Sequence, residues 1–322
     1  MSNMFKRLFF YDKWNIAYRF TNKNFEDGFD FDTPFRFVSM PKNHWGADPF
    51  LINYKDRVLL FCEYTNEKKS KSYIAFKELY PNEDDDWKTA YEFAGHSSYP
   101  CVFEYKQKLY MIPETVFENN VVLLQFDEET NKWKKISQLF GSTNSPDSTF
   151  LYYKNKPSLF LYTICDSDER KLYFCTLSDD LLSMKSKIMV KKYNCADGRP
   201  GGNCIFLNGK NIRVVQPGIN RYGEKIVFYE FGFDKENSFF EKLLFEIKPQ
   251  DILIETKTKI LGIHTYNSLK NIEVIDLFVK GKFDLFRPAK LLFKRLGIFG
   301  FGMYDYKKKY INKEFENNKK EK

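Results

Sequence analysis

Residues 48–63 read DPFLINYKDRVLLFCE, and residues 99–114 read YPCVFEYKQKLYMIPE. Aligned without a gap, the two stretches share an early Pro, a central Tyr-Lys pair, an apolar segment and a final Glu. A third copy, DSTFLYYKNKPSLFLY, occupies residues 147–162, and a fourth, RPGGNCIFLNGKNIRVVQ, occupies residues 199–216. Each copy has a short apolar segment, a turn rich in Lys, Asn, Asp and Gly, and a second apolar segment. This pattern predicts a β-hairpin that recurs at a period of about 50 residues.

Further strand-like segments follow each hairpin, which gives about four strands in each repeat. These segments are residues 72–79, 121–126, 171–177 and 225–231. A fifth, more diverged unit covers residues 259–267 and 271–279. Repeats of this length with four strands each are typical of a β-propeller, so we predict an all-β, five-bladed propeller over residues 1–283.

The predicted propeller needs a closing strand. The fifth unit lacks an outer strand, and the segment KWNIAYRF, residues 13–20, stands alone before the first repeat. We therefore expect this N-terminal strand to complete the last blade, because closure removes exposed sheet edges.

Composition agrees with a β-rich protein. Phe, Tyr and Trp make up 18% of the chain, with 34 Phe and 21 Tyr, and these residues favour strands. No pair of cysteines has CxxC spacing, so they are expected to be buried free thiols of a reducing compartment. The six are Cys62, Cys101, Cys165, Cys175, Cys195 and Cys204.

Charge and targeting signals limit the partners. The N-terminus lacks the apolar core of a signal peptide, and no apolar run is long enough to span a bilayer, so a cytoplasmic location is expected. The net charge of +8 suits an anionic partner, although Lys-rich and Asn-rich codon usage explains it equally well. Because the positive charge is spread along the chain, nucleic acid is not an expected partner.

The repeat predicts which residues meet at the propeller axis, because the first strand of every blade lines the central channel. One ring should hold Asp48, Tyr99, Asp147 and the segment around Arg199. A second set, at the end of each second strand, is Glu63, Glu114, Tyr162 and Gln216. Asp48, Glu114 and Asp147 are the candidate catalytic acids. The alternative for each is a turn residue or a strand cap.

All three histidines, His44, His96 and His264, fall at repeat openings, and Trp45 follows the first of them. We predict that these residues bind substrate. A metal site is the alternative, but no HxH or HxxxH spacing occurs, so neither a metal nor another cofactor is predicted.

The stretch DGRPGGN, residues 197–203, combines an arginine with two glycines. Arg199 can clamp a phosphate or carboxylate, and the amides of Gly201 and Gly202 can form an anion-binding nest. The alternative is an ordinary turn between blades in which Arg199 pairs with Asp197 or Asp48. Tyr222, in QPGINRYGEK, is expected to shape the same rim.

The ordered motifs resemble a known family. WGADPF, SYP followed by MIPET, DSTF, RPGGN, QPG with YG, and GIHT occur in that order. The pattern resembles the N-terminal propeller domain of glucosamine inositolphosphorylceramide transferases, and the match spans residues 13 to about 280. It is more distantly similar to five-bladed arabinanase and fructosidase glycosidases. The resemblance implies a carbohydrate ligand, a role in surface-polysaccharide synthesis, and Asp48 as the first-blade acid with Glu114 and Asp147 as partners.

A basic tail, residues 284–322, follows the predicted propeller. From Lys282 to Tyr304 there are five Lys or Arg against one Asp, interleaved with Phe, Leu and Ile. We predict a helical, amphipathic segment that lies on a membrane surface, followed by a disordered end. The alternative is a helix that docks on the propeller.

Three functions fit these features. The first is a cytoplasmic glycosyltransferase of cell-surface polysaccharide or lipopolysaccharide synthesis. It would transfer a sugar from a nucleotide-sugar donor to a lipid-linked glycan at the inner membrane surface. Asp48 or Glu114 would act as base or as stabiliser of an oxocarbenium-like centre, and Arg199 would steady the leaving phosphate. The second is an arabinanase-type glycoside hydrolase. The third is a non-catalytic glycan-binding module.

Overall fold

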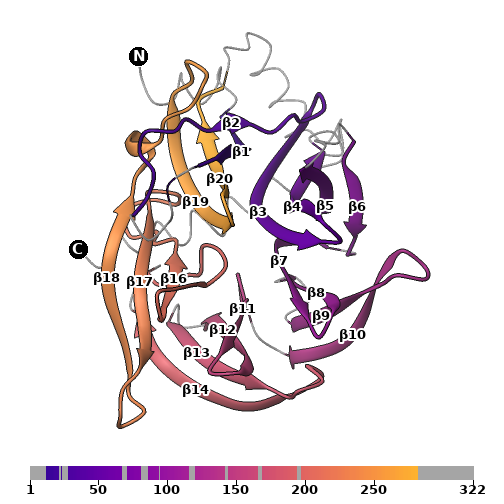
Figure 1. Ribbon diagram of the computed structural model, residues 1–322, viewed down its shortest axis with the longest axis vertical. Coiled ribbons are helices and arrows are strands. Elements are labelled where there is room, and N and C mark those ends of the chain that lie inside the picture. The colour runs from indigo at the N-terminus through magenta and orange to yellow at the C-terminus, as the bar shows by residue number, and fades with distance from the viewer. Residues whose placement is uncertain are drawn as a thin grey trace, which may run out of the picture.

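The computed structural model describes residues 12–281, except for residues 22, 24–27, 67–70, 81–85, 94, 116–119, 142–143, 166–168 and 194–196. In this part of the chain, five four-stranded antiparallel sheets are arranged around a central axis (Figure 1). The predicted all-β, five-bladed propeller is therefore confirmed.

The first four blades follow the chain order. Blade 1 contains β3 (His44–Tyr54), β4 (Arg57–Asn66), β5 (Lys71–Tyr80) and β6 (Lys88–Tyr91). Blade 2 contains β7 (Ser98–Tyr105), β8 (Lys108–Glu114), β9 (Asn120–Asp127) and β10 (Lys132–Gly141). Blade 3 contains β11 (Thr149–Tyr153), β12 (Lys156–Ile164), β13 (Arg170–Leu177) and β14 (Met184–Tyr193). Blade 4 contains β15 (Ile205–Leu207), β16 (Lys210–Val215), β17 (Ile226–Phe233) and β18 (Phe239–Ile247), and a 3-10 turn, η3 (Pro249–Asp251), follows it.

Blade 5 joins the two ends of the described chain. Its strand order is β19 (Ile260–Leu269), β20 (Ile272–Val279), β1 (Lys13–Phe20) and β2 (Arg36–Phe37). β1 pairs with β20 from Lys13 opposite Val279 to Phe20 opposite Ile272. The predicted closure by the N-terminal strand is confirmed, and the N-terminal segment also supplies the outermost strand, β2.

The Tyr-Lys pair of the repeat lies at the tip of the first hairpin in blades 1, 2 and 3. In blade 1 the turn residues Lys55 and Asp56 both have positive φ, 49° and 63°. Blades 2 and 3 repeat this with Lys106–Gln107 and Lys154–Asn155. Two central residues with positive φ define a type I′ turn, whose twist matches that of the flanking strands. The turn geometry therefore explains why the spacing between the two apolar segments does not vary among these three copies.

The core consists of apolar layers between neighbouring sheets. The largest cluster joins blades 1, 2 and 3 and includes Phe61, Met111 and Leu161. Smaller clusters fill the gaps between blades 3 and 4, blades 4 and 5, and blades 5 and 1. Because each sheet buries both faces, the strands carry long apolar runs rather than a simple alternation.

The described cysteines do not form disulfides with one another. The five described cysteines are free thiols; Cys62, Cys101 and Cys175 are buried, and Cys165 and Cys204 are half-buried. Cys195 and the predicted tail, residues 284–322, lie outside the described residues. Among the residues that are described, no helix is long and apolar enough to cross a bilayer.

Candidate functional site

A β-bulge near the start of the first strand positions the axial side chains. The register of the first hairpin shifts between Ala47 and Phe50 in blade 1, and between Ser98 and Cys101 in blade 2. The residues inside these bulges, Asp48 and Tyr99, have positive φ of 51° and 44°. A bulge bends its strand and redirects a side chain. Asp147, which precedes β11 with φ of 55°, has the same conformation in blade 3.

Asp48 is held by residues from both neighbouring blades, 5 and 2, and is only 4% exposed. Its Oδ1 accepts a hydrogen bond from the Thr265 hydroxyl at 3.0 Å and lies 3.0 Å from His264 Nε2, both in blade 5. Its Oδ2 accepts a hydrogen bond from the Tyr99 amide of blade 2 at 3.3 Å. The sequence repeat thus does bring the start of one first strand into contact with those of its neighbours.

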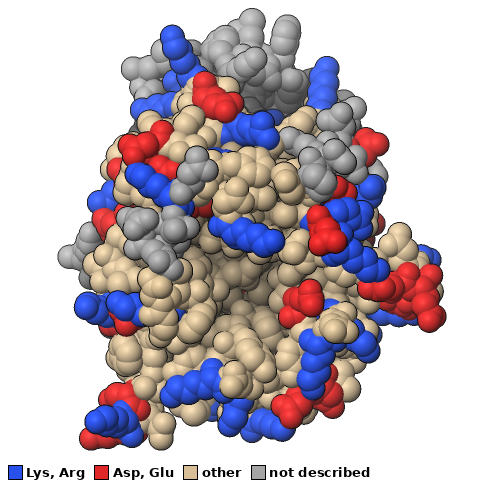
Figure 2. Space-filling model, viewed as in Figure 1, with Lys and Arg blue, Asp and Glu red and all other residues tan. Residues whose placement is uncertain are grey.

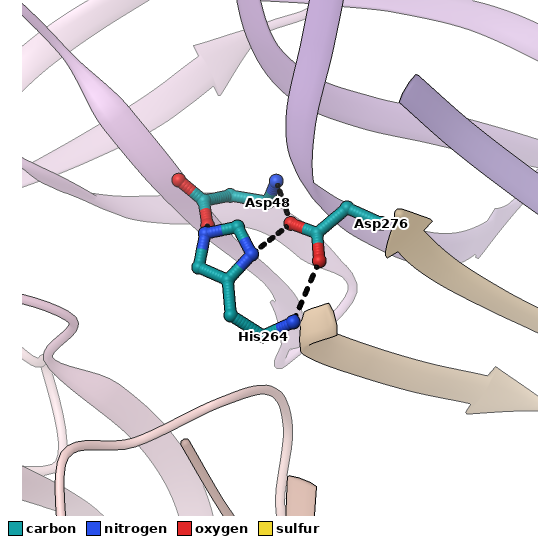
Figure 3. Close-up of side chains that lie close together, drawn as sticks. All are labelled: Asp48, His264 and Asp276. Carbon is teal, nitrogen blue, oxygen red and sulfur yellow. Dashed lines mark hydrogen bonds and ion pairs between the residues drawn. The ribbon is translucent and has the colours of Figure 1, made fainter. Parts of the chain in front are cut away.

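His264 lies between two carboxylates (Figure 3). Its Nδ1 is 2.7 Å from Asp276 Oδ2, on the opposite side of the ring from Asp48. Asp276 also accepts hydrogen bonds from three backbone amides, those of Asp48 at 2.9 Å, His264 at 3.1 Å and Thr265 at 2.9 Å. The three side chains form an ion triad that links blade 5 to blade 1.

The electrostatics of the triad favour an imidazolium. Burial by itself lowers the pKa of His264, but the negative charges of Asp276 and Asp48 outweigh it and raise the pKa to about 9. The ligand atoms of the three residues all lie within 4.8 Å of one another, a spacing that also suits a metal ion. In the imidazolium form, however, both ring nitrogens are donors and neither offers a lone pair to a cation. With His264 protonated the cluster is an ion triad, and with that proton displaced the same three side chains would offer ligand atoms to a cation.

The raised pKa of His264 predicts a loss of stability at alkaline pH. His264 binds its proton more tightly in the folded protein than in the unfolded chain, where the pKa of histidine is 6.5. The stabilisation, about 3 kcal/mol at most, is complete below pH 6.5 and is lost as the pH rises through about 9. Urea unfolding of wild type and His264→Gln across this range measures it. The wild-type advantage should shrink as the pH rises, and an advantage that is constant with pH would show that the proton on His264 does not stabilise the fold.

A second cluster is built around Arg199. Its Nε donates to Asp147 in a short hydrogen bond, and its NH2 group donates to Glu114 at 3.2 Å. Gln216 Nε2 donates to Asp147 at 2.9 Å and to the Pro200 carbonyl at 2.8 Å. The cluster therefore combines predicted site residues from blades 2, 3 and 4, and the predicted alternative partners of Arg199, Asp197 and Asp48, are not the ones seen in these hydrogen bonds.

Asp147 and Glu114 form a carboxyl pair with limited access to solvent, at 1% and 9% exposed. Burial raises the pKa of Asp147 well above its usual range; Arg199 opposes this change, and the neighbouring Glu114 adds to it. Two carboxyl groups that share one buried site do not ionise together readily. The pair is thus suited to hold a proton near neutral pH.

Gly201 and Gly202 have a structural role that the sequence did not predict. The Gly201 amide donates to the Val214 carbonyl at 3.0 Å, and the Gly202 amide donates to the Tyr99 hydroxyl at 2.8 Å. Both amides are engaged, so this pair does not form the predicted anion-binding nest. The physical reason for the glycines is close packing, since a Cβ on Gly202 would lie 1.9 Å from the Tyr266 carbonyl oxygen.

The remaining predicted residues divide between the axis and its surroundings. Tyr99 is completely buried, and its hydroxyl bonds Thr149 at 2.9 Å and Gly202, so it bridges blades 2, 3 and 4 across the channel. Glu63, also fully buried, accepts a hydrogen bond from Ser72 at 2.8 Å and lies 3.6 Å from His96 Nε2.

Three further predicted residues have backbone or aromatic neighbours. The ring of His44 lies 3.0 Å from the Lys42 carbonyl and packs on Tyr64 with a centroid distance of 5.0 Å. Trp45 is buried opposite Thr65 in β4. Tyr162 is buried against Tyr193 of the same blade. His44 and Trp45 thus have these neighbours within blade 1, whereas Tyr162 also belongs to the apolar layer between blades 3 and 4.

Sequence reasoning missed Asp276, Thr265 and Trp14. The signal for Asp276 was present, since it is a charged residue inside the apolar strand IEVIDLFV, and a buried acid needs partners. Trp14, in the closing strand, packs on His264 with ring centroids 4.1 Å apart and approaches Tyr222 at 5.9 Å. Because β1 lies outside the repeat, no comparison among repeats pointed to it.

The face of the molecule shown in Figure 2 is hollowed at its centre, where the blades meet, and the visible lining is mainly uncharged. This agrees with the burial of the axial acids, none of which is more than 9% exposed. The half-buried residues of the site are Arg199, Tyr222, Trp14 and His96.

Two solved structures illustrate the similarity of fold. The α-L-arabinofuranosidase from Lactobacillus brevis is 11% identical, with a TM-score of 0.50, and the match covers 70% of this chain and 80% of that one. A thermostable family-43 glycoside hydrolase is 13% identical, with a TM-score of 0.50 and coverage of 74% and 94%. At these identities the likeness is one of fold. No curated protein matches the chain significantly.

A family model extends over most of the propeller. The model described as "Glucosamine inositolphosphorylceramide transferase 1, N-terminal" matches residues 36–270, which is more than half of the chain. The matched region begins at β2 and ends in the turn between β19 and β20. It includes every residue of the two carboxylate clusters except Asp276, and it does not include Trp14. The chain therefore belongs to the family of the N-terminal domain of glucosamine inositolphosphorylceramide transferase 1.

Proposed function

We propose that the propeller is a glycosyltransferase whose axial site receives a nucleotide-sugar donor and a lipid-linked glycan acceptor. Family membership supports a role in glycosyl transfer. The observation that carries the proposal is the contrast between two carboxyl environments at one axis. Asp48 faces an imidazolium, whereas Asp147 is buried beside a second carboxyl group that raises its pKa. Such a contrast separates an ionised group from a proton-holding one, as acid–base chemistry at a glycosidic centre requires.

The roles follow from these environments. Asp48 is the anionic group that accepts the acceptor's proton or stabilises positive charge at the anomeric carbon. The Asp147–Glu114 pair holds a proton that can pass to the departing oxygen. Arg199, which is 14% exposed at its side chain, stands between that pair and solvent and steadies the leaving phosphate.

A glycoside hydrolase is the second candidate, and the charge of the site favours it. Four carboxyl groups, from Asp48, Asp276, Asp147 and Glu114, surround two cationic groups, from His264 and Arg199. Arg199 already bonds two of these acids, so a donor phosphate has to compete with Glu114 for its NH2 group. A neutral glycoside meets no such competition.

One experiment separates the candidates. The full-length protein is incubated with a panel of nucleotide sugars, with and without a lipid-linked glycan acceptor, and separately with a panel of aryl glycosides. Acceptor-dependent release of the nucleoside diphosphate supports the transferase. Release of aryl alcohol without nucleotide chemistry supports the hydrolase. Sugar binding without turnover of any substrate leaves a glycan-binding module and contradicts both enzymatic proposals.

We further propose that the enzyme works in the cytoplasm at the inner membrane surface, in the synthesis of surface polysaccharide or lipopolysaccharide. The support is the net charge of +8 and the basic, apolar composition of residues 284–322. Full-length protein should sediment with vesicles that contain anionic lipid, and deletion of residues 284–322 should abolish this.

A second, full-length variant tests the charge of the tail separately from its length. In this variant Lys290, Lys294 and Arg295 are replaced by Glu. It retains the length of the segment but reverses its charge, so it should also lose vesicle binding. Unchanged binding of the deletion variant would place the membrane contact elsewhere.

A further inference from the structure

A pair of aromatic side chains packs against His264 of the buried triad. Trp14 comes from β1, and Tyr222 comes from the loop between β16 and β17. Their rings meet nearly at right angles, at 83°, with centroids 5.9 Å apart. Both rings pack on His264, at centroid distances of 4.1 Å and 5.0 Å. His264 itself is 1% exposed, whereas Trp14 and Tyr222 are half-buried, so both rings reach solvent beside the buried imidazole.

The packing around both rings holds this aromatic corner in place. Trp14 also packs on Phe278 of β20, with centroids 5.2 Å apart. Gly223, with φ of 71°, lets the loop approach Trp14, since a Cβ there would lie 2.9 Å from the indole ring. The Gly223 carbonyl accepts a hydrogen bond from the Ile263 amide at 2.9 Å, which ties the loop to β19. The corner is therefore formed before any ligand arrives.

The corner also connects the two carboxylate clusters. The guanidinium carbon of Arg199 lies 5.9 Å from the centroid of the Tyr222 ring. The same ring packs nearly at a right angle against Trp14 and contacts His264, the partner of Asp48. The aromatic corner thus lies beside residues of both clusters, His264 of the triad and Arg199 of the second cluster.

We propose that Trp14 and Tyr222 receive the apolar C–H face of a sugar ring and direct its hydroxyl groups toward the two clusters. This inference rests on the proposed carbohydrate function and adds the surface that orients the sugar. A pyranose or furanose ring is amphipathic, with C–H bonds on its faces and hydroxyl groups at its edge, and aromatic rings provide an apolar surface that fits such a face.

The angle between the rings favours a sugar over a nucleobase. A flat base stacks on one face or between parallel aromatic faces. Two rings at 83° instead form a corner, in which a puckered ring can contact one aromatic face and abut the other. The sugar of the donor, and not its base, is therefore the expected occupant.

The test measures equilibrium binding by calorimetry, independently of turnover. The probes are nucleotide sugars, the matching nucleoside diphosphates, and methyl glycosides of the same sugars. Wild type should bind at least one sugar-bearing probe. Trp14→Ala and Tyr222→Ala should weaken that binding about tenfold or more, whereas Trp14→Phe and Tyr222→Phe should stay within about threefold. Affinity for the nucleoside diphosphates should be the same in all five proteins.

Because Trp14 contributes to the closing blade, thermal melts accompany each variant. Tyr222 lies outside the strands, so Tyr222→Ala provides the test even where Trp14→Ala does not fold. Unchanged affinity for sugar-bearing probes in folded Ala variants overturns the inference, and so does an equal loss for the nucleoside diphosphates, or a wild type that binds no sugar. Sugar binding that depends on the corner but leads to no turnover supports the inference while contradicting the transferase.

Discussion

Asp48→Asn is expected to lower the turnover of the preferred substrate about a thousandfold, within the range for loss of an acid–base group. The substitution keeps the size of the side chain but removes its charge. His264 then faces a neutral amide on one side, with Asp276 as its only neighbouring anion in the triad. Both the acceptor's base and the anion that stabilises the anomeric carbon are lost.

The measurement is kcat on the substrate identified in the panel, together with the substrate dissociation constant. Asp56→Asn is the matched control, because it makes the same chemical change at an exposed hairpin turn in the same blade, where φ is 63° and Asn is well tolerated. The control should retain wild-type turnover. If Asp48→Asn keeps more than about a tenth of wild-type kcat, Asp48 is not the catalytic base.

Arg19→Met is expected to cost about 3–5 kcal/mol of unfolding free energy, which is the range for breaking a buried ion pair. Arg19 is 3% exposed; its Nε donates a hydrogen bond to Glu273 Oε2 at 2.6 Å, and its NH2 group lies 2.5 Å from the same oxygen as an ion pair. Its NH1 group donates to the Thr33 carbonyl at 2.6 Å. The substitution leaves the Glu273 carboxylate buried with the Tyr266 hydroxyl, at 2.7 Å, as its remaining partner in this network.

This network closes the ring, since Arg19 lies in β1, Glu273 lies in β20, and the guanidinium packs over Phe29 and Phe35. Lys55→Met is the matched control: it breaks an exposed ion pair with Glu128 between blades 1 and 2 and should leave the unfolding free energy nearly unchanged. Urea unfolding measures both. An Arg19→Met variant as stable as Lys55→Met would mean that the Arg19–Glu273 ion pair does not stabilise the closed propeller.

Much of this architecture is predictable from the sequence, because the repeat places strands, turns and ring positions at equivalent sites. The gapless alignment of residues 48–63 with 99–114 reflects identical two-residue turns. It also predicts that Asp48 and Asp147 approach one axis. The lone strand at residues 13–20 has an unambiguous role once the fifth unit is found to be short.

The chemistry within the ring is less predictable, because it depends on contacts between blades. Arg199 has hydrogen-bond partners in blades 2 and 3, at separations of 85 and 52 residues, whereas the local sequence offers Asp197 as a nearer candidate. The glycines of the RPGGN motif resemble an anion nest in sequence, yet their spacing reflects the approach of β19. Trp14 contacts a residue 250 positions later, and nothing in its local sequence indicates this.

The most direct test of the central claim, that acids from separate blades meet at one bound sugar, is a crystal structure of Asp48→Asn with the substrate identified in the panel. The sugar ring should lie on Trp14 and Tyr222, with its hydroxyl groups within hydrogen-bonding distance of residue 48 and of Arg199 or Glu114. A sugar bound on an outer strand or at a hairpin tip, with the axial residues unchanged, would contradict the account.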